Sequence, residues 1–197
     1  MKKAYVIISP KSSGNRMMVR AIESTQDFGM GGHTYSSNSS FNYKSKWIDD
    51  VDKQDPKILD EALKTAPEEF VYVVSIPSGG LPNKKYLEIA KIILMMMKNG
   101  YTVYPIVIHR DIMPMSKSQA NAGHAVDVSS AKNTISKAYK HIFSELAMVR
   151  RQPIIVKYEQ FVTSESYRRW IFCRVLDLPI EPTIEFFNAN EKHDTSI

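Results

Sequence analysis

The chain has 197 residues, of which 43% are hydrophobic and 24% charged, so it is long enough to bury a substantial core. No apolar run approaches the roughly 20 residues that a membrane-spanning helix needs, and the apolar part of the N-terminus is too short for a signal peptide. Cys173 is the single cysteine and cannot form an internal disulfide, so we expect a cytoplasmic protein. From the length and the short apolar runs we expect a single domain over residues 1–197 that binds no membrane. The net charge of +5 suits an anionic ligand, but the basic residues form no arm or tail, and we expect no nucleic-acid partner.

Apolar runs and amphipathic segments alternate along the chain, which predicts strands alternating with helices. In chain order we expect a strand at 3–9, helices at 16–23 and 56–65, a strand at 69–76, a helix at 84–99, a strand at 101–109, helices at 116–122 and 132–149, a strand at 153–158 and a helix at 164–176. Ser164 is the expected N-cap of the last helix. Residues 29–46, rich in glycine, serine and asparagine, predict a flexible loop or lid. The tail, 180–197, is expected to be irregular, with at most one turn near 183–187.

This alternation predicts an α/β fold, a mostly parallel sheet of four or five strands flanked by helices on both faces. Pro105 lies inside the third expected strand and weakens that prediction, because proline lacks a backbone N–H. Ligands of such sheets bind beyond the carboxyl ends of the strands. Those ends are residues 9–14, 76–80, 109–118 and 158–159.

The first strand runs directly into Pro-Lys-Ser-Ser-Gly-Asn-Arg, residues 10–16, and then into a basic helix. Gly14 lets the backbone turn tightly and bring its N–H groups close to an anion. The helix adds unpaired N–H donors and the positive end of its dipole. Further donors come from Lys11, Ser12, Ser13, Asn15 and Arg16. The pattern predicts an anion site, with a plain strand–helix turn as the alternative. It lacks the GxxxxGK[ST] spacing of ATP-hydrolysing P-loops.

A second polar segment, residues 108–118, follows the third expected strand. Arg110 stands at the strand end and Ser118 follows eight residues later, near the start of a helix. A guanidinium and a hydroxyl in those places can converge on one phosphate. Alternatively, Arg110 pairs with a surface acid.

Together these segments resemble the sulfotransferase family. Residues 10–16 look like its 5′-phosphosulfate loop, residues 107–118 look like its 3′-phosphate motif, and residues 154–179 are similar to its late strand–Tyr-Glu–helix segment. The resemblance covers most of residues 4–179. It implies a three-layer sandwich of the P-loop nucleotide-hydrolase type. It also implies metal-free transfer of a sulfuryl group from 3′-phosphoadenosine 5′-phosphosulfate to a hydroxyl or amine of a small acceptor.

Carried over residue by residue, the resemblance assigns the 5′ loop to Ser13, Gly14, Asn15 and Arg16, and the 3′-phosphate contacts to Arg110 and Ser118. The family usually places a basic residue two positions before the glycine, where this chain has Ser12, and Lys11 stands one residue earlier. Ile112 replaces the proline that follows the Arg-Asp pair. Lys11 remains the expected cation on the departing phosphate.

The acceptor side needs a base to remove the acceptor's proton. His33, in the glycine-rich loop, is the predicted base, and Glu23 is the alternative. Ser78 and Gly79 follow the second apolar strand and are expected to line the acceptor site, or to form a plain turn. His124 is expected at the surface.

Two other functions stay open. A kinase-like phosphotransferase would need a carboxylate for magnesium, and Asp111 is the only obvious one at a strand end. A non-catalytic nucleotide-binding protein would keep the fold without the base. The sequence does not distinguish among carbohydrate, lipid, phenol and peptide acceptors.

Overall fold

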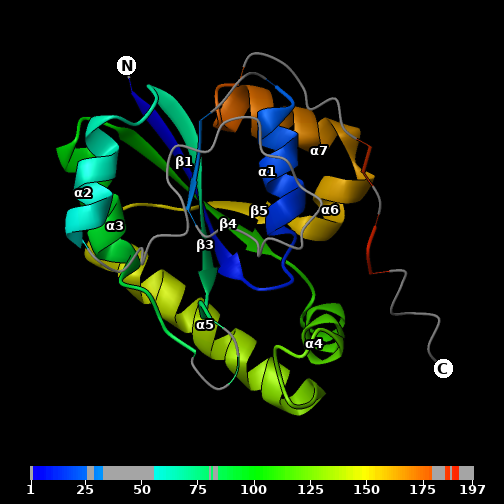
Figure 1. Ribbon diagram of the computed structural model, residues 1–197. Coiled ribbons are helices and arrows are strands. Elements are labelled where there is room, and N and C mark those ends of the chain that lie inside the picture. Colours follow the sequence, from blue (N-terminus) through cyan, green and yellow to red (C-terminus); the bar gives the residue numbers. More distant parts are fainter. Residues whose placement is uncertain are drawn as a thin grey trace.

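The computed structural model describes residues 2–25, 29–32, 56–79, 81, 84–178, 185–186 and 188–190. Within these ranges, the strands form one parallel five-stranded sheet in the order β2-β3-β1-β4-β5 (Figure 1). The strands are β1 (Lys3–Pro10), β2 (Gly29–Gly32), β3 (Glu69–Ile76), β4 (Thr102–His109) and β5 (Ile154–Lys157). The predicted α/β fold is confirmed. None of the described helices is both long and apolar enough to cross a membrane.

Helices cover both faces of the sheet and make three layers (Figure 1). One face carries α2 (Pro56–Lys64), α3 (Ile89–Lys98) and α5 (Val128–Met148). The other carries α1 (Asn15–Glu23), α6 (Tyr158–Thr163) and α7 (Glu165–Arg169), which continues into the π-helical turn η1 (Trp170–Val175). Alternate side chains of β1 enter opposite cores, because successive residues of a strand point to opposite faces.

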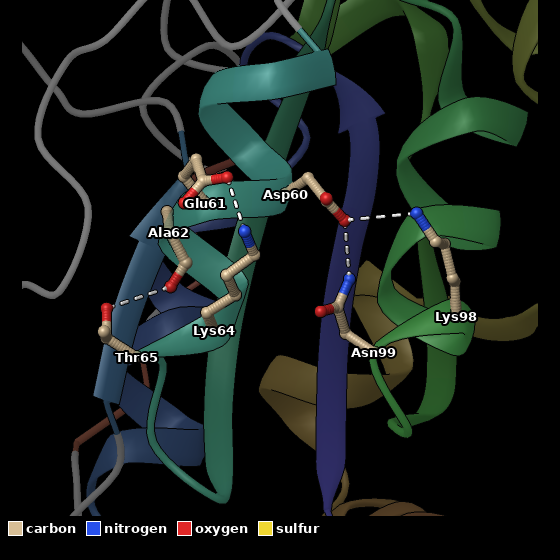
Figure 2. Close-up of polar contacts among 7 residues, drawn as sticks. All are labelled: Asp60, Glu61, Ala62, Lys64, Thr65, Lys98 and Asn99. Carbon is tan, nitrogen blue, oxygen red and sulfur yellow. Dashed lines mark hydrogen bonds and ion pairs between the residues drawn. The ribbon is translucent and has the colours of Figure 1, made fainter.

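Surface polar contacts also join α2 to α3 (Figure 2). Asp60 Oδ1 accepts a 3.0 Å hydrogen bond from Asn99 Nδ2 and lies 3.8 Å from Lys98 Nζ. The Asn99 hydrogen bond lowers the pKa of Asp60, with smaller help from Lys98 and Lys64. We call Asp60, Lys98 and Asn99 the α2–α3 cluster.

Several element boundaries differ from the sequence predictions. The loop prediction for 29–46 is wrong at its start, because Gly29–Gly32 pairs with β3 as the edge strand β2; residues 33–46 lie outside the described ranges. The helix predicted at 84–99 begins only at Ile89. Lys85 instead exchanges backbone hydrogen bonds of 2.8 and 3.0 Å with Ser78, which holds this segment extended.

The helix predicted at 116–122 is α4 (Ile112–Asn121), and it begins four residues earlier than expected. Asp111 caps it by accepting a 2.9 Å hydrogen bond from the Met113 N–H. Pro114 fits in the first turn, where backbone N–H groups have no partner within the helix. Ser118 therefore lies in the second turn of α4 and not at the start of the helix.

The remaining differences lie in the C-terminal half. α5 begins at Val128 rather than at 132, with Asp127 as its N-cap. The strand predicted at 153–158 ends at Lys157, and the next residue starts α6. The single helix predicted at 164–176 is divided into α7 and η1, while the prediction of Ser164 as N-cap is confirmed by its hydrogen bond from the Tyr167 N–H. Most of the tail lies outside the described residues.

Pro105 is accommodated inside β4 because of where the neighbouring strands pair. The Ile108 N–H donates to Ser9 on β1, so alternate residues of β4 point their N–H groups toward β1. Pro105 belongs to the other set, which faces β5, and β5 pairs only from Ile106 onward. The sheet therefore loses no hydrogen bond because Pro105 lacks an N–H.

The order of the strands places a crevice at the carboxyl end of β1. The helix after β1 packs on one face, whereas the helices after β3 and β4, the strands on either side of β1, pack on the other (Figure 1). Connections that leave in opposite directions open a crevice between them, where α/β proteins bind ligands.

Candidate functional site

The loop between β1 and α1 has the conformation of a close-approach turn. Ser12 and Gly14 both have positive φ, 65° and 104°. A Cβ at Gly14 would lie 2.8 Å from the Tyr158 ring, so the backbone approaches the ring more closely than a side chain allows. No side chain caps α1. Its first N–H groups therefore remain available to an anion at the carboxyl edge.

Ser13 and Asn15, predicted as ligand contacts, are buried and hold the shape of this loop. Ser13 Oγ donates a 2.7 Å hydrogen bond to the Pro10 carbonyl, and Asn15 Nδ2 donates one of 3.2 Å to Ser75 Oγ at the end of β3. Asn15 Oδ1 is buried and has no partner among the described residues. Arg16 is exposed on the first turn of α1.

Arg110 lies against the same loop. Its Nη1 donates a 2.8 Å hydrogen bond to the Ser12 carbonyl, and its guanidinium stacks 4.4 Å above the centre of the Tyr158 ring. The side chain is only 6% exposed, and its Nη2 has no partner within the described part of the chain. Burial lowers the pKa of Arg110, an effect that nearby Tyr158 and Glu159 oppose. The two predicted phosphate motifs therefore meet at one edge of the sheet.

A segment near the C-terminus covers this arginine. Asn190 Oδ1 accepts a 2.8 Å hydrogen bond from Arg110 Nε, and Asn190 Nδ2 donates one of 2.9 Å to Glu159 Oε1. The Ala189 N–H donates to the Tyr158 hydroxyl at 3.1 Å. We call Arg110, Glu159 and Asn190 the arginine cluster. Sequence reasoning noted the Tyr-Glu pair at a strand end but had no signal for Asn190.

Lys11 reaches the neighbouring strand end instead. Its ammonium donates to the carbonyl of Gly79, so two residues predicted separately come together on the β3 side of the loop. Ser78 is buried and binds Lys85 through its backbone. Burial lowers the pKa of Lys11, and the charge of Lys84 lowers it further.

Two residues that sequence reasoning missed interact electrostatically with Lys11. Lys84 Nζ donates a 3.2 Å hydrogen bond to Thr134 Oγ1 on α5. His124, expected at the surface, is half-buried in the loop between α4 and α5, and burial followed by the charges of Lys11 and Lys84 lowers its pKa. We call Lys11, Lys84 and His124 the lysine–histidine cluster. Neither new member belongs to a motif, so only their position reveals them.

α4 contacts the loop through other residues than the predicted Ser118. Gln119 Nε2 donates a 2.8 Å hydrogen bond to the Lys11 carbonyl, and the Met115 sulfur lies 3.6 Å from Ser13 Oγ. Across the described ranges, no hydrogen bond joins Ser118 to Arg110, and Ser118 is half-buried on α4.

Of the two predicted bases, the structure describes only Glu23, and it lies away from this edge. Glu23 ends α1, about 12 Å along the helix axis from its first residue at 1.5 Å per residue. His33 lies outside the described residues. The described residues contain no group of three His, Cys, Asp or Glu side chains that could hold a metal, and the Asp111 carboxylate caps α4.

The carboxyl edge thus has basic side chains in two places, Arg110 on the β4 side and Lys11 with Lys84 on the β3 side, with the α1 N-terminus between them. A scan against protein-family models finds no match for the chain, and a search of curated proteins finds no significant match.

Proposed function

We propose that the protein is a sulfotransferase that binds 3′-phosphoadenosine 5′-phosphosulfate along the carboxyl edge of the sheet. The sulfuryl group passes to a hydroxyl or amine of a small acceptor. The observation that carries the proposal is the 2.8 Å hydrogen bond from Arg110 Nη1 to the Ser12 carbonyl, because it joins the two segments expected to bind opposite ends of this nucleotide.

The donor carries anionic groups at both ends, which suits an edge with Arg110 on one side and Lys11 on the other. The α1 N-terminus and Lys11 bind the 5′-phosphosulfate, where a cation stabilises charge on the bridging oxygen as the phosphate departs. Arg110 binds the 3′-phosphate through Nη2, which has no partner among the described residues. Since Arg110 is only 6% exposed, the phosphate reaches it when Asn190 moves aside.

Calorimetry with 3′-phosphoadenosine 5′-phosphate, compared with ATP and magnesium, tests the proposal. We expect tight, magnesium-independent binding of the former. Arg110→Ala should weaken it, since each charge-assisted hydrogen bond contributes on the order of 1.5–3 kcal/mol, or about 10- to 150-fold in Kd. Lys98→Ala removes a cation of the α2–α3 cluster and should leave the affinity unchanged. A parent protein that prefers ATP with magnesium, or an Arg110→Ala variant with parental affinity, would refute the assignment.

A non-catalytic nucleotide-binding protein is the second candidate, and one contact favours it. The Lys11 ammonium donates to the Gly79 carbonyl, which holds it on the β3 side of the loop and leaves only its remaining N–H donors for a departing phosphate. Sulfuryl transfer from labelled donor to a panel of acceptors separates the two functions. The sulfotransferase proposal predicts transfer by the parent and a large loss in Lys11→Ala; nucleotide binding with no transfer to any acceptor selects the second candidate.

A further inference from the structure

The Arg110 guanidinium has two edges that can donate hydrogen bonds, and only one of them is fully used by the described residues. On the first edge, Nη1 donates to the Ser12 carbonyl at 2.8 Å. On the second edge, the Nε–H and one Nη2 N–H point in the same direction, because the guanidinium is planar; we call this pair the fork. Nε donates to Asn190 Oδ1 at 2.8 Å, whereas Nη2 is buried without a partner among the described residues. Asn190 therefore fills half of the fork.

The Asn190 carboxamide has no second oxygen for the fork. Its nitrogen donates instead to Glu159 Oε1, at 2.9 Å. A phosphate or sulfate has oxygen atoms for both N–H groups, and charge-assisted contacts of this kind are about twice as strong as neutral ones. Glu159 Oε1 also accepts a 3.0 Å hydrogen bond from the Asp111 N–H, so it keeps a partner when the amide leaves. An anion with two oxygens thus satisfies Arg110 better than Asn190 does.

The segment that carries Asn190 is anchored at Phe186, four residues before it. The Phe186 ring packs edge-on against Phe161 of α6, with ring centres 5.4 Å apart, and the Arg168 guanidinium lies 4.5 Å from the centre of the Phe186 ring. Phe186 is only half-buried, so the anchor lies at the surface and not in the core. Aromatic and cation–π contacts at such a site are modest, which suits an attachment that opens and closes.

Two backbone contacts join this anchor to the amide. The Ala189 N–H donates to the Tyr158 hydroxyl at 3.1 Å, and the Asn190 N–H donates to Asn188 Oδ1 at 3.1 Å, which makes a local turn. We call Phe186, Ala189 and Asn190 the C-terminal strap. The strap thus holds one side-chain amide over the guanidinium while its aromatic anchor is attached elsewhere, on α6 and α7.

We propose that the C-terminal strap is an autoinhibitory element that competes with an anion for the fork of Arg110. A phosphate of the ligand takes both N–H groups, the Asn190 amide leaves, and the strap detaches from the Tyr158 hydroxyl. Arg110 keeps its hydrogen bond to Ser12 throughout. The inference rests on the proposed function for the identity of the ligand, whose 3′-phosphate is then the competing group. The closed strap weakens binding in proportion to the fraction of molecules that are closed.

Phe186→Ala in the full chain tests the proposal, because Phe186 anchors the strap at a distance from Arg110. We expect the Kd for 3′-phosphoadenosine 5′-phosphate to fall by about 2- to 10-fold. Trp170→Ala is the matched control, since this ring is 53% exposed on η1 and packs 6.0 Å from Tyr167; it should leave the Kd unchanged. A double variant with Asn190→Ala should gain less than the product of the two single effects, because full opening sets the limit.

The Ala189 N–H reports the state of the strap directly, through hydrogen exchange followed by NMR. Its bond to the Tyr158 hydroxyl should protect it in the parent, Phe186→Ala should lower this protection, and bound nucleotide should remove it. A nucleotide that binds while Ala189 stays protected overturns the inference, and so does a folded Phe186→Ala variant with parental or weaker affinity. Phe186→Leu, which loses the aromatic contacts but keeps an apolar side chain, replaces Phe186→Ala if that variant does not fold.

A second set of ligands separates this inference from the proposed function. A parent that binds no 3′-phosphoadenosine 5′-phosphate overturns the proposed function. Inorganic phosphate and inorganic sulfate then decide the inference by themselves. Loss of Ala189 protection on adding either anion supports a strap that anions displace, and unchanged protection with both anions overturns the inference as well.

Discussion

The arginine cluster and the α2–α3 cluster contain the same chemical groups in different surroundings. Each has a cation, a carboxylate and an asparagine amide, and in each the amide donates to the carboxylate, at 3.0 Å in the α2–α3 cluster and 2.9 Å in the arginine cluster. The α2–α3 cluster joins two helices at the surface (Figure 2), with Lys98 76% exposed at its side chain. Arg110 is only 6% exposed.

This difference in burial distinguishes a surface contact between two helices from a buried guanidinium with an unpartnered donor among the described residues. An exposed ion pair adds little to stability, because water already solvates both charges. A buried donor without a partner instead costs about 1–3 kcal/mol. Arg110 Nη2 is such a donor among the described residues, so its burial costs stability, which supports the proposal that it binds an anion.

The largest expected effect comes from adding a methyl group beneath the arginine cluster. Gly14→Ala should destabilise the protein by about 1–2 kcal/mol from backbone strain at positive φ, and further because Tyr158, which supports Arg110, must shift. Gly100→Ala, beside the α2–α3 cluster, has φ 85° but no atom within 4 Å of the added Cβ, and should show the strain alone. Urea denaturation measures both. An equal loss in the free energy of unfolding for both variants would show that the contact with Tyr158 adds nothing to the cost of Gly14→Ala.

A smaller effect is expected when the cover of Arg110 is removed. Asn190→Ala should tighten binding of 3′-phosphoadenosine 5′-phosphate by up to about tenfold, because the phosphate no longer displaces hydrogen bonds that contribute about 0.5–1.5 kcal/mol each. Asn99→Ala breaks the equivalent amide contact of the α2–α3 cluster and should change stability but not affinity. Calorimetry measures the affinity of both variants for 3′-phosphoadenosine 5′-phosphate. Weaker binding by Asn190→Ala than by the parent would mean that Asn190 contacts the nucleotide and does not merely cover Arg110.

The smallest effect concerns the pH dependence of the α2–α3 cluster. The lowered pKa of Asp60 means that its ionised form favours the folded state. Its contribution is therefore complete above the ordinary value of about 3.9 and is lost as the pH falls through the lowered pKa. Asp60→Asn should be slightly less stable than the parent at pH 7 and should converge with it in acid, as followed by urea midpoints at pH 7 and pH 3. A constant difference across this range would remove Asp60 from the acid response.

The sequence predicted those elements and residues whose signal lies in neighbouring positions of the chain, and it missed those that depend on distant ones. β1, β3 and β4 are apolar runs that predict buried strands whatever surrounds them, and Gly14 marks a turn by its own backbone freedom. β2 could not be predicted, because four residues from a glycine-rich stretch form a strand only where the free edge of β3 offers hydrogen-bond partners. Asn190 lies 80 residues from Arg110, and no sequence pattern near either residue predicts their contact.

The sequence by itself determined the order of the strands and helices apart from β2 and α6, and it predicted two segments with residue types suited to phosphate, because hydrophobic period and glycine conformation are properties of neighbouring residues. Only the tertiary structure decided that Arg110 meets the loop at Ser12, and that the charges of Lys11 and Lys84 act on His124. Parallel strands bring their carboxyl ends to one edge whatever their separation in the chain, and burial there then lowers the pKa of Lys11, Arg110 and His124.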